Sequence, residues 1–281
     1  MEKMHIVFDA DKCVGCYNCL LACRDEFCSN TWLPYTEAQE EHGEPWIKTT
    51  RHERGAPPHT EAAFLTEMCR HCENAACERA FPDCVTRRPD GIVLLKPDKA
   101  RGNRALTKAC PYGAIAWNEE LKTAQKCTMC AHLLDSGWTE PRCVQACPLR
   151  ALSVVRCSDE DFAAFSAKNG LQSRGAEDSG ARVVYKNLWK TDSVFITGAV
   201  CRVTDGIERA VEGAECALYL NGEPILTAKT DFFGEFKLDR LPKGSGGFTV
   251  AITAPGFAGQ RLNAEVVDEC VDLGVIYLDR N

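Results

Sequence analysis

The spacing of four cysteines near the N-terminus constrains this chain more than any other feature. Residues 13–23 read Cys-Val-Gly-Cys-Tyr-Asn-Cys-Leu-Leu-Ala-Cys, so three cysteines come at steps of three and a fourth follows four residues later. This spacing is typical of a [4Fe–4S] loop, in which three thiolates hold one cluster and the fourth reaches a neighbouring one. Gly15 would let the loop close tightly around the cluster. We therefore expect more than one cluster in this part of the chain.

Cysteine is also unusually frequent. Of eighteen cysteines in 281 residues, fifteen precede residue 158. In a secreted protein such a number would suggest a disulfide framework. The first candidate ligand falls at residue 13, which leaves no room for a signal peptide before it. We therefore expect metal loops in a cytoplasmic protein, or in one exported as a passenger with a signal-bearing partner. No apolar run is long enough for a transmembrane helix.

A second loop begins at Cys69-Arg-His-Cys72 and continues to Cys77. A ferredoxin motif would place its crossing cysteine four residues later, and a further loop would place cysteines at positions 100, 103 and 106. The chain has Phe81, Ala100, Asn103 and Leu106 at these four positions, and then an isolated Cys110-Pro111. Because fourth cysteines cross between loops, losing one cluster removes these four ligands together. We expect that this cluster is absent and that Cys110 serves the cluster of the second loop.

The last loop is Cys127-Thr-Met-Cys130, followed by Cys143 and then by Cys147-Pro148. The same crossing rule predicts three [4Fe–4S] clusters with no ligand missing, although Arg24 stands after Cys23 where proline is common. Cluster one would bind Cys13, Cys16, Cys19 and Cys147. Cluster two would bind Cys69, Cys72, Cys77 and Cys110. Cluster three would bind Cys23, Cys127, Cys130 and Cys143.

Zinc is the main alternative for any single Cys-x-x-Cys pair, since it also binds four thiolates. Zinc does not require three cysteines at three-residue steps with a Cys-Pro partner elsewhere, so the pattern favours iron–sulfur clusters. Six cysteines remain, which we interpret as small buried apolar residues: Cys28, Cys84, Cys157, Cys201, Cys216 and Cys270. His71 and His132 lie beside cluster cysteines and could tune a potential by hydrogen bonding, although a surface or structural role is the simpler interpretation. Lys126 and Arg142 also neighbour cluster ligands and could offset the negative charge of a thiolate-bound cluster.

Residues 1–158 are expected to form a ferredoxin-like domain, in which residues 24–68 are an insertion of loops and short strands. A helix and linker region follows at 159–192. Residues 159–169 predict an amphipathic helix, with Ser158 as its N-cap and Gly170 at its C-terminal stop.

From residue 193 to residue 281, cysteine spacing gives way to period-two alternation interrupted by turn signals. This pattern predicts seven strands of a β-sandwich: 194–203, 214–221, 224–230, 234–239, 247–254, 260–267 and 271–278. We therefore expect an α+β fold, with a double ferredoxin-like iron–sulfur domain followed by an all-β, immunoglobulin- or transthyretin-like sandwich.

The sequence contains no nucleophile–base pair and no Gly-rich phosphate loop. The net charge of −7 argues against a nucleic-acid partner. One-electron centres without a visible substrate site indicate an electron carrier for a partner rather than a complete enzyme. The alternative of another class is a metal-stabilised scaffold that binds a partner through residues 193–281.

The cysteine pattern of residues 1–157 resembles the iron–sulfur (beta) subunits of molybdopterin oxidoreductases of the dimethyl-sulfoxide-reductase family. The segments Gln125-Lys-Cys-Thr-Met-Cys-Ala-His-Leu-Leu-Asp135 and Thr230-Asp-Phe-Phe-Gly-Glu-Phe236 narrow the resemblance to small subunits of transhydroxylases that act on polyhydroxylated aromatic rings. This resemblance implies a large catalytic partner that holds molybdenum and two pyranopterin guanine dinucleotides. It implies hydroxyl transfer by the partner, or electron delivery to a reductive, catechol-type dehydroxylase.

Overall fold

The computed structural model describes residues 2–175 and 179–281. Their contacts divide the protein into two compact units. The first comprises Met1–Arg51 and Ala63–Leu188, and the second comprises His52–Ala62 and Trp189–Asn281. The division therefore falls at residue 188, and a short segment near residue 57 groups with the C-terminal unit.

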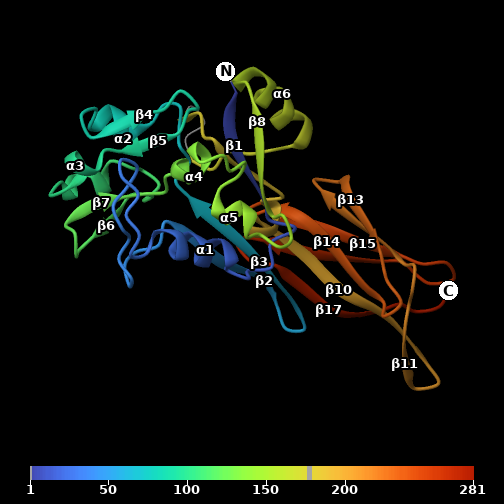
Figure 1. Cartoon of the computed structure of the whole chain (residues 1–281). Helices are drawn as coiled ribbons and strands as arrows, with labels where there is room; N and C mark the ends of the chain where they lie inside the picture. Colours follow the sequence, from blue (N-terminus) through green and yellow to red (C-terminus); the bar gives the residue numbers. More distant parts are fainter. Residues whose placement is uncertain (1, 176–178) are drawn as a thin grey trace. The chain divides into compact units, whose positions relative to one another are not determined.

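The first unit is organised around strand β1 (Lys3–Asp9), whose five central residues are buried. It pairs antiparallel with β8 (Leu152–Cys157) and parallel with β9 (Val183–Lys186), as Figure 1 shows for β1 and β8. Apolar residues on consecutive positions are typical of a strand covered on both faces. Strand β1 leads directly into the first cysteine loop, and β9 extends its sheet from within the predicted linker region.

The other elements before β8 are α1 (Asn18–Phe27), β2 (Ile47–Ala56), β3 (His59–Met68), α2 (Ala76–Ala80), β4 (Val85–Arg87), β5 (Val93–Leu95), α3 (Pro97–Ala100), the 3-10 helix η1 (Arg104–Lys108), β6 (Ala116–Asn118), β7 (Thr123–Gln125), α4 (Ala131–Asp135) and α5 (Arg142–Gln145). They are mostly short, apart from α1, β2 and β3, and the parts of β2 and β3 within His52–Ala62 group with the second unit. Strands β4 and β5 form one small antiparallel hairpin, and β6 and β7 form another. Five of the candidate cysteines are buried in the same core as Met4, Ile6 and Phe8 of β1.

Helix α6 (Asp159–Asn169) has the predicted bounds. The Ser158 hydroxyl accepts a hydrogen bond from the backbone N–H of Asp161, and Gly170 ends the helix in the left-handed conformation. Phe162 is the buried residue of this helix and packs with Val7 and Val184. The helix prediction and both of its cap residues are confirmed.

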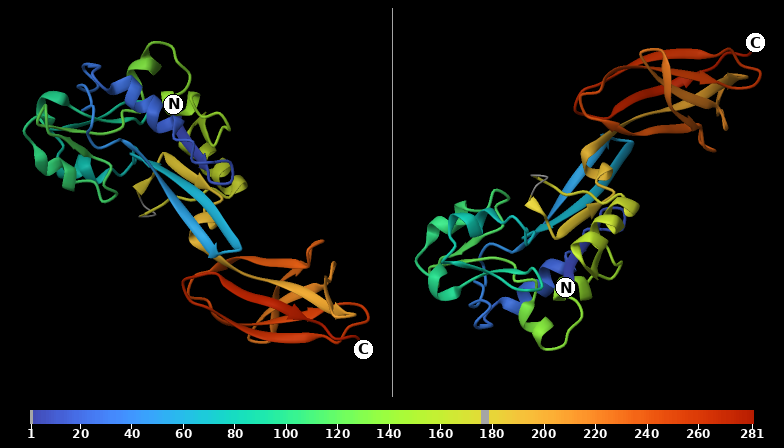
Figure 2. Two further views of the ribbon diagram at one scale, coloured as in Figure 1. Left: turned by 90° about the horizontal axis from the view of Figure 1, so that it is seen from below. Right: turned by 90° about the horizontal axis from the view of Figure 1, so that it is seen from above.

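The second unit contains two four-stranded sheets around one apolar core. The first sheet has the order β11-β10-β14, with β17 also paired to β10, and the second has the order β13-β12-β15-β16. Figure 2 draws these strands in orange to red. Their bounds are β10 (Ser193–Thr204), β11 (Ile207–Ala210), β12 (Glu215–Leu220), β13 (Glu223–Lys229), β14 (Glu235–Pro242), β15 (Gly246–Thr253), β16 (Gln260–Val266) and β17 (Val271–Tyr277), preceded by the short helix α7 (Trp189–Asp192).

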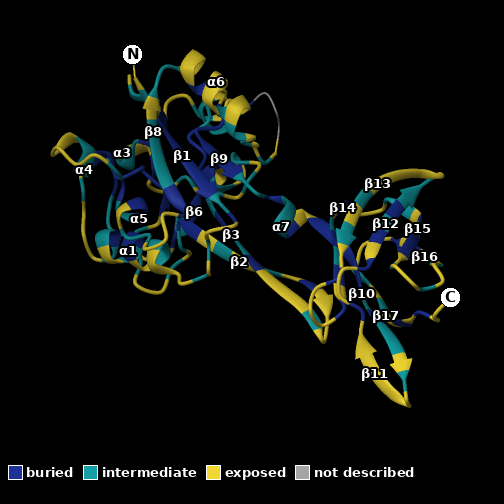
Figure 3. Ribbon diagram, turned by 90° about the vertical axis from the view of Figure 1, so that its right-hand side faces the viewer, coloured by how far each residue is buried: buried dark blue, intermediate teal, exposed yellow. Residues whose placement is uncertain are grey.

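All seven predicted strands of this region are present, and β11 is an additional strand. The four residues of β11 are exposed (Figure 3), so no alternation of buried and exposed positions marked it in the sequence. Residues such as Ile196, Leu218 and Val250 are fully buried between the sheets. An all-β C-terminal region is therefore correct. In the parts of the chain that the structure describes, no helix is long and apolar enough to cross a bilayer.

Candidate iron–sulfur sites

A cavity of about 110 Å³ lies beneath the second cysteine loop. Four cysteines line this cavity: Cys69, Cys72, Cys77 and Cys110. Cys110 comes from a loop that lies far along the chain, so the structure brings together the four residues expected to share cluster two. The volume is several times the roughly 10–15 Å³ that a cavity needs in order to hold one water molecule. We call this site the Cys69 cavity.

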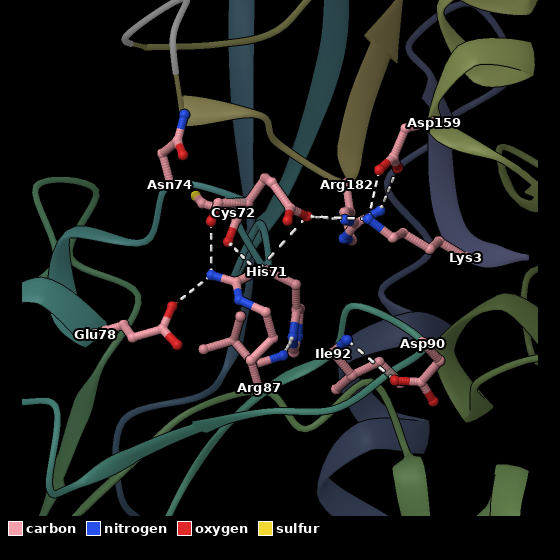
Figure 4. Close-up of polar contacts among 12 residues, drawn as sticks. Lys3, His71, Cys72, Asn74, Glu78, Arg87, Asp90, Ile92, Asp159 and Arg182 are labelled. Atoms are coloured by element: carbon pink, nitrogen blue, oxygen red, sulfur yellow. Dashed lines mark hydrogen bonds and ion pairs between the residues drawn. The ribbon is translucent and has the colours of Figure 1, made fainter. Parts of the chain in front are cut away.

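Buried cationic and polar side chains also line the Cys69 cavity, among them Lys126 and His71. The Nζ of Lys126 lies 3.4 Å from the Sγ of Cys69 and donates to the backbone carbonyl oxygens of Val93 and Cys127. The Nδ1 of His71 accepts a hydrogen bond of 3.2 Å from the backbone N–H of Val93, in the loop region drawn in Figure 4. Burial and then the Lys126 charge hold the pKa of His71 well below its usual value, which favours the neutral ring.

A second site, the Cys13 hollow, lies at the first cysteine loop. Four cysteines line it: Cys13, Cys16, Cys19 and Cys147. Gly15 has φ of +66°, and a Cβ at this position would lie 2.3 Å from the ring of Phe64. The glycine is therefore required both by its backbone conformation and by the side chain packed on the loop.

Sequence reasoning missed two threonines at the Cys13 hollow. The hydroxyls of Thr49 and Thr66 lie 3.0 Å apart, and both residues line the hollow. Burial raises the pKa of Cys13, and hydrogen bonds from the Gly15 backbone and the Thr66 side chain oppose this rise. The sequence signal that could have identified these two threonines is the alternation of residues in the 24–68 region, because alternation places one face of each strand toward the loop.

The third set of cysteines forms a buried cluster, which we call the Cys23 group. Cys23 comes from α1 and Cys143 from α5, and these two helices pack together. Burial raises the pKa of Cys143 well above its usual range, and the neighbouring Cys130, Cys127 and Cys23 raise it further. The structure thus gathers the four residues expected to share cluster three: Cys23, Cys127, Cys130 and Cys143.

The Cys23 group adjoins both of the other sites. Burial raises the pKa of Cys127 to about 11, and Cys69 of the Cys69 cavity contributes to the rise. On the other side, Cys19 of the Cys13 hollow contributes to the raised pKa values of Cys23 and Cys143. Cysteines of the Cys23 group therefore lie close to both the Cys69 cavity and the Cys13 hollow.

The positions where a fourth cluster would be expected are filled with apolar packing. Ala100 and Leu106 are buried in a core with Cys84, and Phe81 packs against this core. The side-chain amide of Asn103 lies 3.6 Å from the Sγ of Cys84. Packing in this core therefore occupies the positions at which a fourth cluster would have its ligands.

The remaining cysteines do not share one environment. None of the eighteen forms a disulfide, and among the six that we did not assign as ligands Cys84 and Cys216 are buried. The other four are partly exposed: Cys28, Cys157, Cys201 and Cys270. Their interpretation as buried apolar residues therefore holds for two of the six.

His132 and Arg142 share a carboxylate next to the Cys23 group. The Nε2 of His132 lies 2.9 Å from Oε1 of Glu26, and the Nε of Arg142 lies 3.3 Å from Oε2 of the same residue. The His132 ring also stacks on Trp32. This arrangement gives His132 the structural role that the sequence favoured.

The donor set at each site suits an iron–sulfur cluster. Each site offers four thiols, the ligands that such clusters use, and is partly or fully shielded from water. Among the described residues, no three His, Cys, Asp or Glu side chains converge closely enough to hold a single metal ion. In the Cys69 cavity, the buried Nε2 of His71 has no hydrogen-bond partner among the described residues, which fits a site that receives a sulfur-rich group.

Comparisons with known proteins extend this picture. Residues 60–157 match the sequence family of the 4Fe-4S dicluster domain. The chain is 39% identical over 282 residues to the pyrogallol hydroxytransferase small subunit of Pelobacter acidigallici, covering 99% of this chain and 100% of that protein. It is 33% identical to a sulfite dehydrogenase subunit of Allochromatium vinosum, over 54% of this chain and 68% of that protein. It is 34% identical to one of the polypeptides of the anaerobic dimethyl sulfoxide reductase of Escherichia coli, over 51% of this chain and 69% of that protein.

Proposed function

Because this protein is a member of the family of iron–sulfur (beta) subunits of dimethyl-sulfoxide-reductase-type molybdopterin enzymes, we propose that it carries three [4Fe–4S] clusters for a larger catalytic partner. Such clusters store and pass single electrons when bound. The chain's own residues supply the thiolates, exclude water and set the electrostatic surroundings. The protein would thus serve electron transfer and would not itself transform a substrate.

The proposed ligand sets follow the three groups of cysteines. Cluster one binds Cys13, Cys16, Cys19 and Cys147; cluster two binds Cys69, Cys72, Cys77 and Cys110; and cluster three binds Cys23, Cys127, Cys130 and Cys143. The single observation that carries this proposal is Cys110, which lines the Cys69 cavity although its own loop has lost its other cysteines. A random scatter of cysteines would not place this residue there.

The positions of the three sites support a linear order for electron transfer, with cluster three between clusters one and two. Cys16 is the one exposed residue among the twelve proposed ligands. We infer that electrons enter or leave the protein most readily at cluster one.

The catalytic partner is proposed to hold molybdenum with two pyranopterin guanine dinucleotides and to act on a polyhydroxylated aromatic compound. The full-length similarity to a pyrogallol hydroxytransferase small subunit supports this substrate class. Hydroxyl transfer requires no net electron supply, whereas a reductive dehydroxylase consumes electrons. Turnover of the purified native complex with and without an external electron donor distinguishes the two reactions.

The first experiment measures iron, acid-labile sulfide and zinc in the anaerobically purified protein. We expect about twelve irons and a matching amount of sulfide per chain, because each cubane holds four of each. Replacing Cys110 with serine should remove the signal of cluster two and leave the other two clusters intact. Zinc without sulfide, or damage to another cluster in the Cys110→Ser variant, would overturn the proposal.

A further inference from the structure

His71 stands between two proposed ligands of cluster two, Cys69 and Cys72, and lines the Cys69 cavity. Its side chain is 1% exposed. The ring is held in place by one hydrogen bond, in which the backbone N–H of Val93 donates to Nδ1 at 3.2 Å. Figure 4 shows His71 beside Cys72 in this loop region.

The hydrogen bond from the backbone N–H of Val93 determines which ring nitrogen of His71 carries the proton. In a neutral imidazole, one ring nitrogen donates and the other accepts. Because Nδ1 faces an N–H donor, it must accept, and the proton therefore resides on Nε2. A protonated ring would set two N–H groups against each other, so the geometry itself selects the neutral form.

The Nε2–H donor of His71 has no acceptor among the described residues. A buried donor without a partner costs free energy, and native proteins rarely leave one in place without a reason. Besides His71, the cavity is lined by four cysteines, by apolar side chains, and by Arg70, Asn74, Arg79, Lys126 and Ser179, none of which accepts a hydrogen bond from Nε2. The missing acceptor is therefore best supplied by the sulfur-rich group that these cysteines bind.

We propose that His71 is a positioning residue that donates its Nε2–H to a sulfur of cluster two, an inference that rests on the proposed function. The donor is preset, because the Val93 backbone fixes both the ring orientation and the tautomer. Hydrogen bonds to cluster sulfurs stabilise the more negative, reduced state and so raise the reduction potential. His71 thereby sets cluster two at a higher potential than its four thiolates alone would give.

His132 provides the contrast within the same protein. It also lies two residues from a proposed ligand, Cys130, and it is also buried. Its Nε2, however, contacts the Glu26 carboxylate at 2.9 Å. The two histidines therefore look alike in sequence but differ in whether Nε2 is already engaged.

The first test detects the hydrogen bond directly in the full-length protein. Protein labelled with ¹⁵N at its histidine rings is reduced, and pulsed electron paramagnetic resonance is recorded on cluster two, whose signal is identified by its absence from the Cys110→Ser variant. We expect a ring-nitrogen coupling that disappears in His71→Met and persists in His132→Met. A wild-type cluster two that shows no such coupling overturns the inference, whether or not the variants fold.

The second test measures the midpoint potential of cluster two by redox titration. We expect His71→Met to lower the midpoint by at least the equivalent of a tenfold change in the reduction equilibrium, which is 59 mV for a one-electron couple. His71→Gln, which keeps an amide donor, should restore part of the shift, and His132→Met should leave cluster two unchanged. A loaded His71→Met cluster with the wild-type potential overturns the inference. Absence of cluster two from the wild type would instead overturn the proposed function.

Discussion

The ammonium group of Lys126 lies 3.4 Å from the sulfur of Cys69 in the interior of the first unit. Lysine is almost never fully buried unless it is paired. Here Lys126 is 3% exposed, and it immediately precedes Cys127, a proposed ligand of cluster three. A buried lysine therefore contacts the sulfur of one proposed ligand of cluster two and the backbone carbonyl of a proposed ligand of cluster three.

Replacing Lys126 with methionine is expected to make the nearby clusters harder to reduce. The ammonium charge offsets part of the negative charge on the thiolates and stabilises the reduced state more than the oxidised one. We expect the midpoint of cluster two to fall by about 59 mV or more, a tenfold change for a one-electron couple. Redox titration followed by electron paramagnetic resonance measures this shift.

Lys122→Met is the matched control, because Lys122 lies in the same hairpin region but is exposed and paired with Glu119. Equal shifts in both variants would contradict the role of Lys126.

Gly15→Ala is expected to abolish cluster one. The backbone conformation costs about 1–2 kcal/mol for a residue with a Cβ, and the added carbon would meet Phe64 at 2.3 Å. The Gly113→Ala variant separates the backbone effect from the contact with Phe64. Gly113 has a similar φ of +62°, but no atom lies within 4 Å of a Cβ added there. Iron content and the signal of each cluster report the outcome. Gly113→Ala should keep all clusters, and loss of cluster one from Gly15→Ala should be selective.

Much of the fold could be predicted because its signals are local. Helix α6 has a capping serine and a terminal glycine at the positions where their side-chain and backbone chemistry requires them. The strands of the second unit show alternation that matches burial between two sheets. The cysteine loops have fixed spacing because a cubane has fixed geometry, so the candidate site residues could be grouped before their positions were known.

The remaining features depend on contacts between distant residues, which local patterns do not encode. Strand β9 joins β1 as a parallel partner, although its sequence lay in the predicted linker. The state of His71 depends on a backbone group of Val93, more than twenty positions away. Arg54, in the 24–68 region, belongs to the second unit through its contacts with Asp239.

The buried ion pairs of Arg54 are expected to contribute measurably to the stability of the second unit. Its side chain is 5% exposed, lies 2.9 Å from Asp239 and 2.6 Å from Glu61, and donates to Ser193. Removing one member of a buried ion pair leaves the other uncompensated, so Arg54→Met should cost about 2–3 kcal/mol, discounted from the fully buried case because both carboxylates are partly exposed. Thermal unfolding measures the loss.

Lys237 is the graded control for Arg54. It contacts the same two carboxylates, Glu61 and Asp239, but its side chain is 32% exposed. Exposed ion pairs contribute about 1 kcal/mol or less. Lys237→Met should therefore shift the unfolding midpoint less than Arg54→Met does. A smaller effect from Arg54 than from Lys237 would contradict the role assigned to burial.

The buried ring of His5 predicts that stability falls in mild acid. His5 is 3% exposed, and its ring stacks on Phe162 at 3.5 Å, with Nε2 3.8 Å from Oδ1 of Asp159. Burial, followed by the charge of Arg182, lowers the pKa of His5 to about 4, while Asp159 opposes this effect and Lys3 adds to it. The folded ring therefore resists protonation.

The sign of the pH dependence follows from the two pKa values of His5. The unfolded state takes up the proton below pH 6.5 and the folded state only below about pH 4, so stability falls as the pH drops through this window. The loss reaches up to about 3 kcal/mol at roughly 1.4 kcal/mol per pKa unit. His5→Phe keeps the stack on Phe162 and should remove this loss of up to about 3 kcal/mol in the free energy of unfolding between pH 7 and pH 4. The unfolding midpoint of the variant should therefore fall less with pH than that of the wild type. The exposed His42→Phe variant should retain the wild-type slope, and an unchanged slope in His5→Phe would refute the assignment.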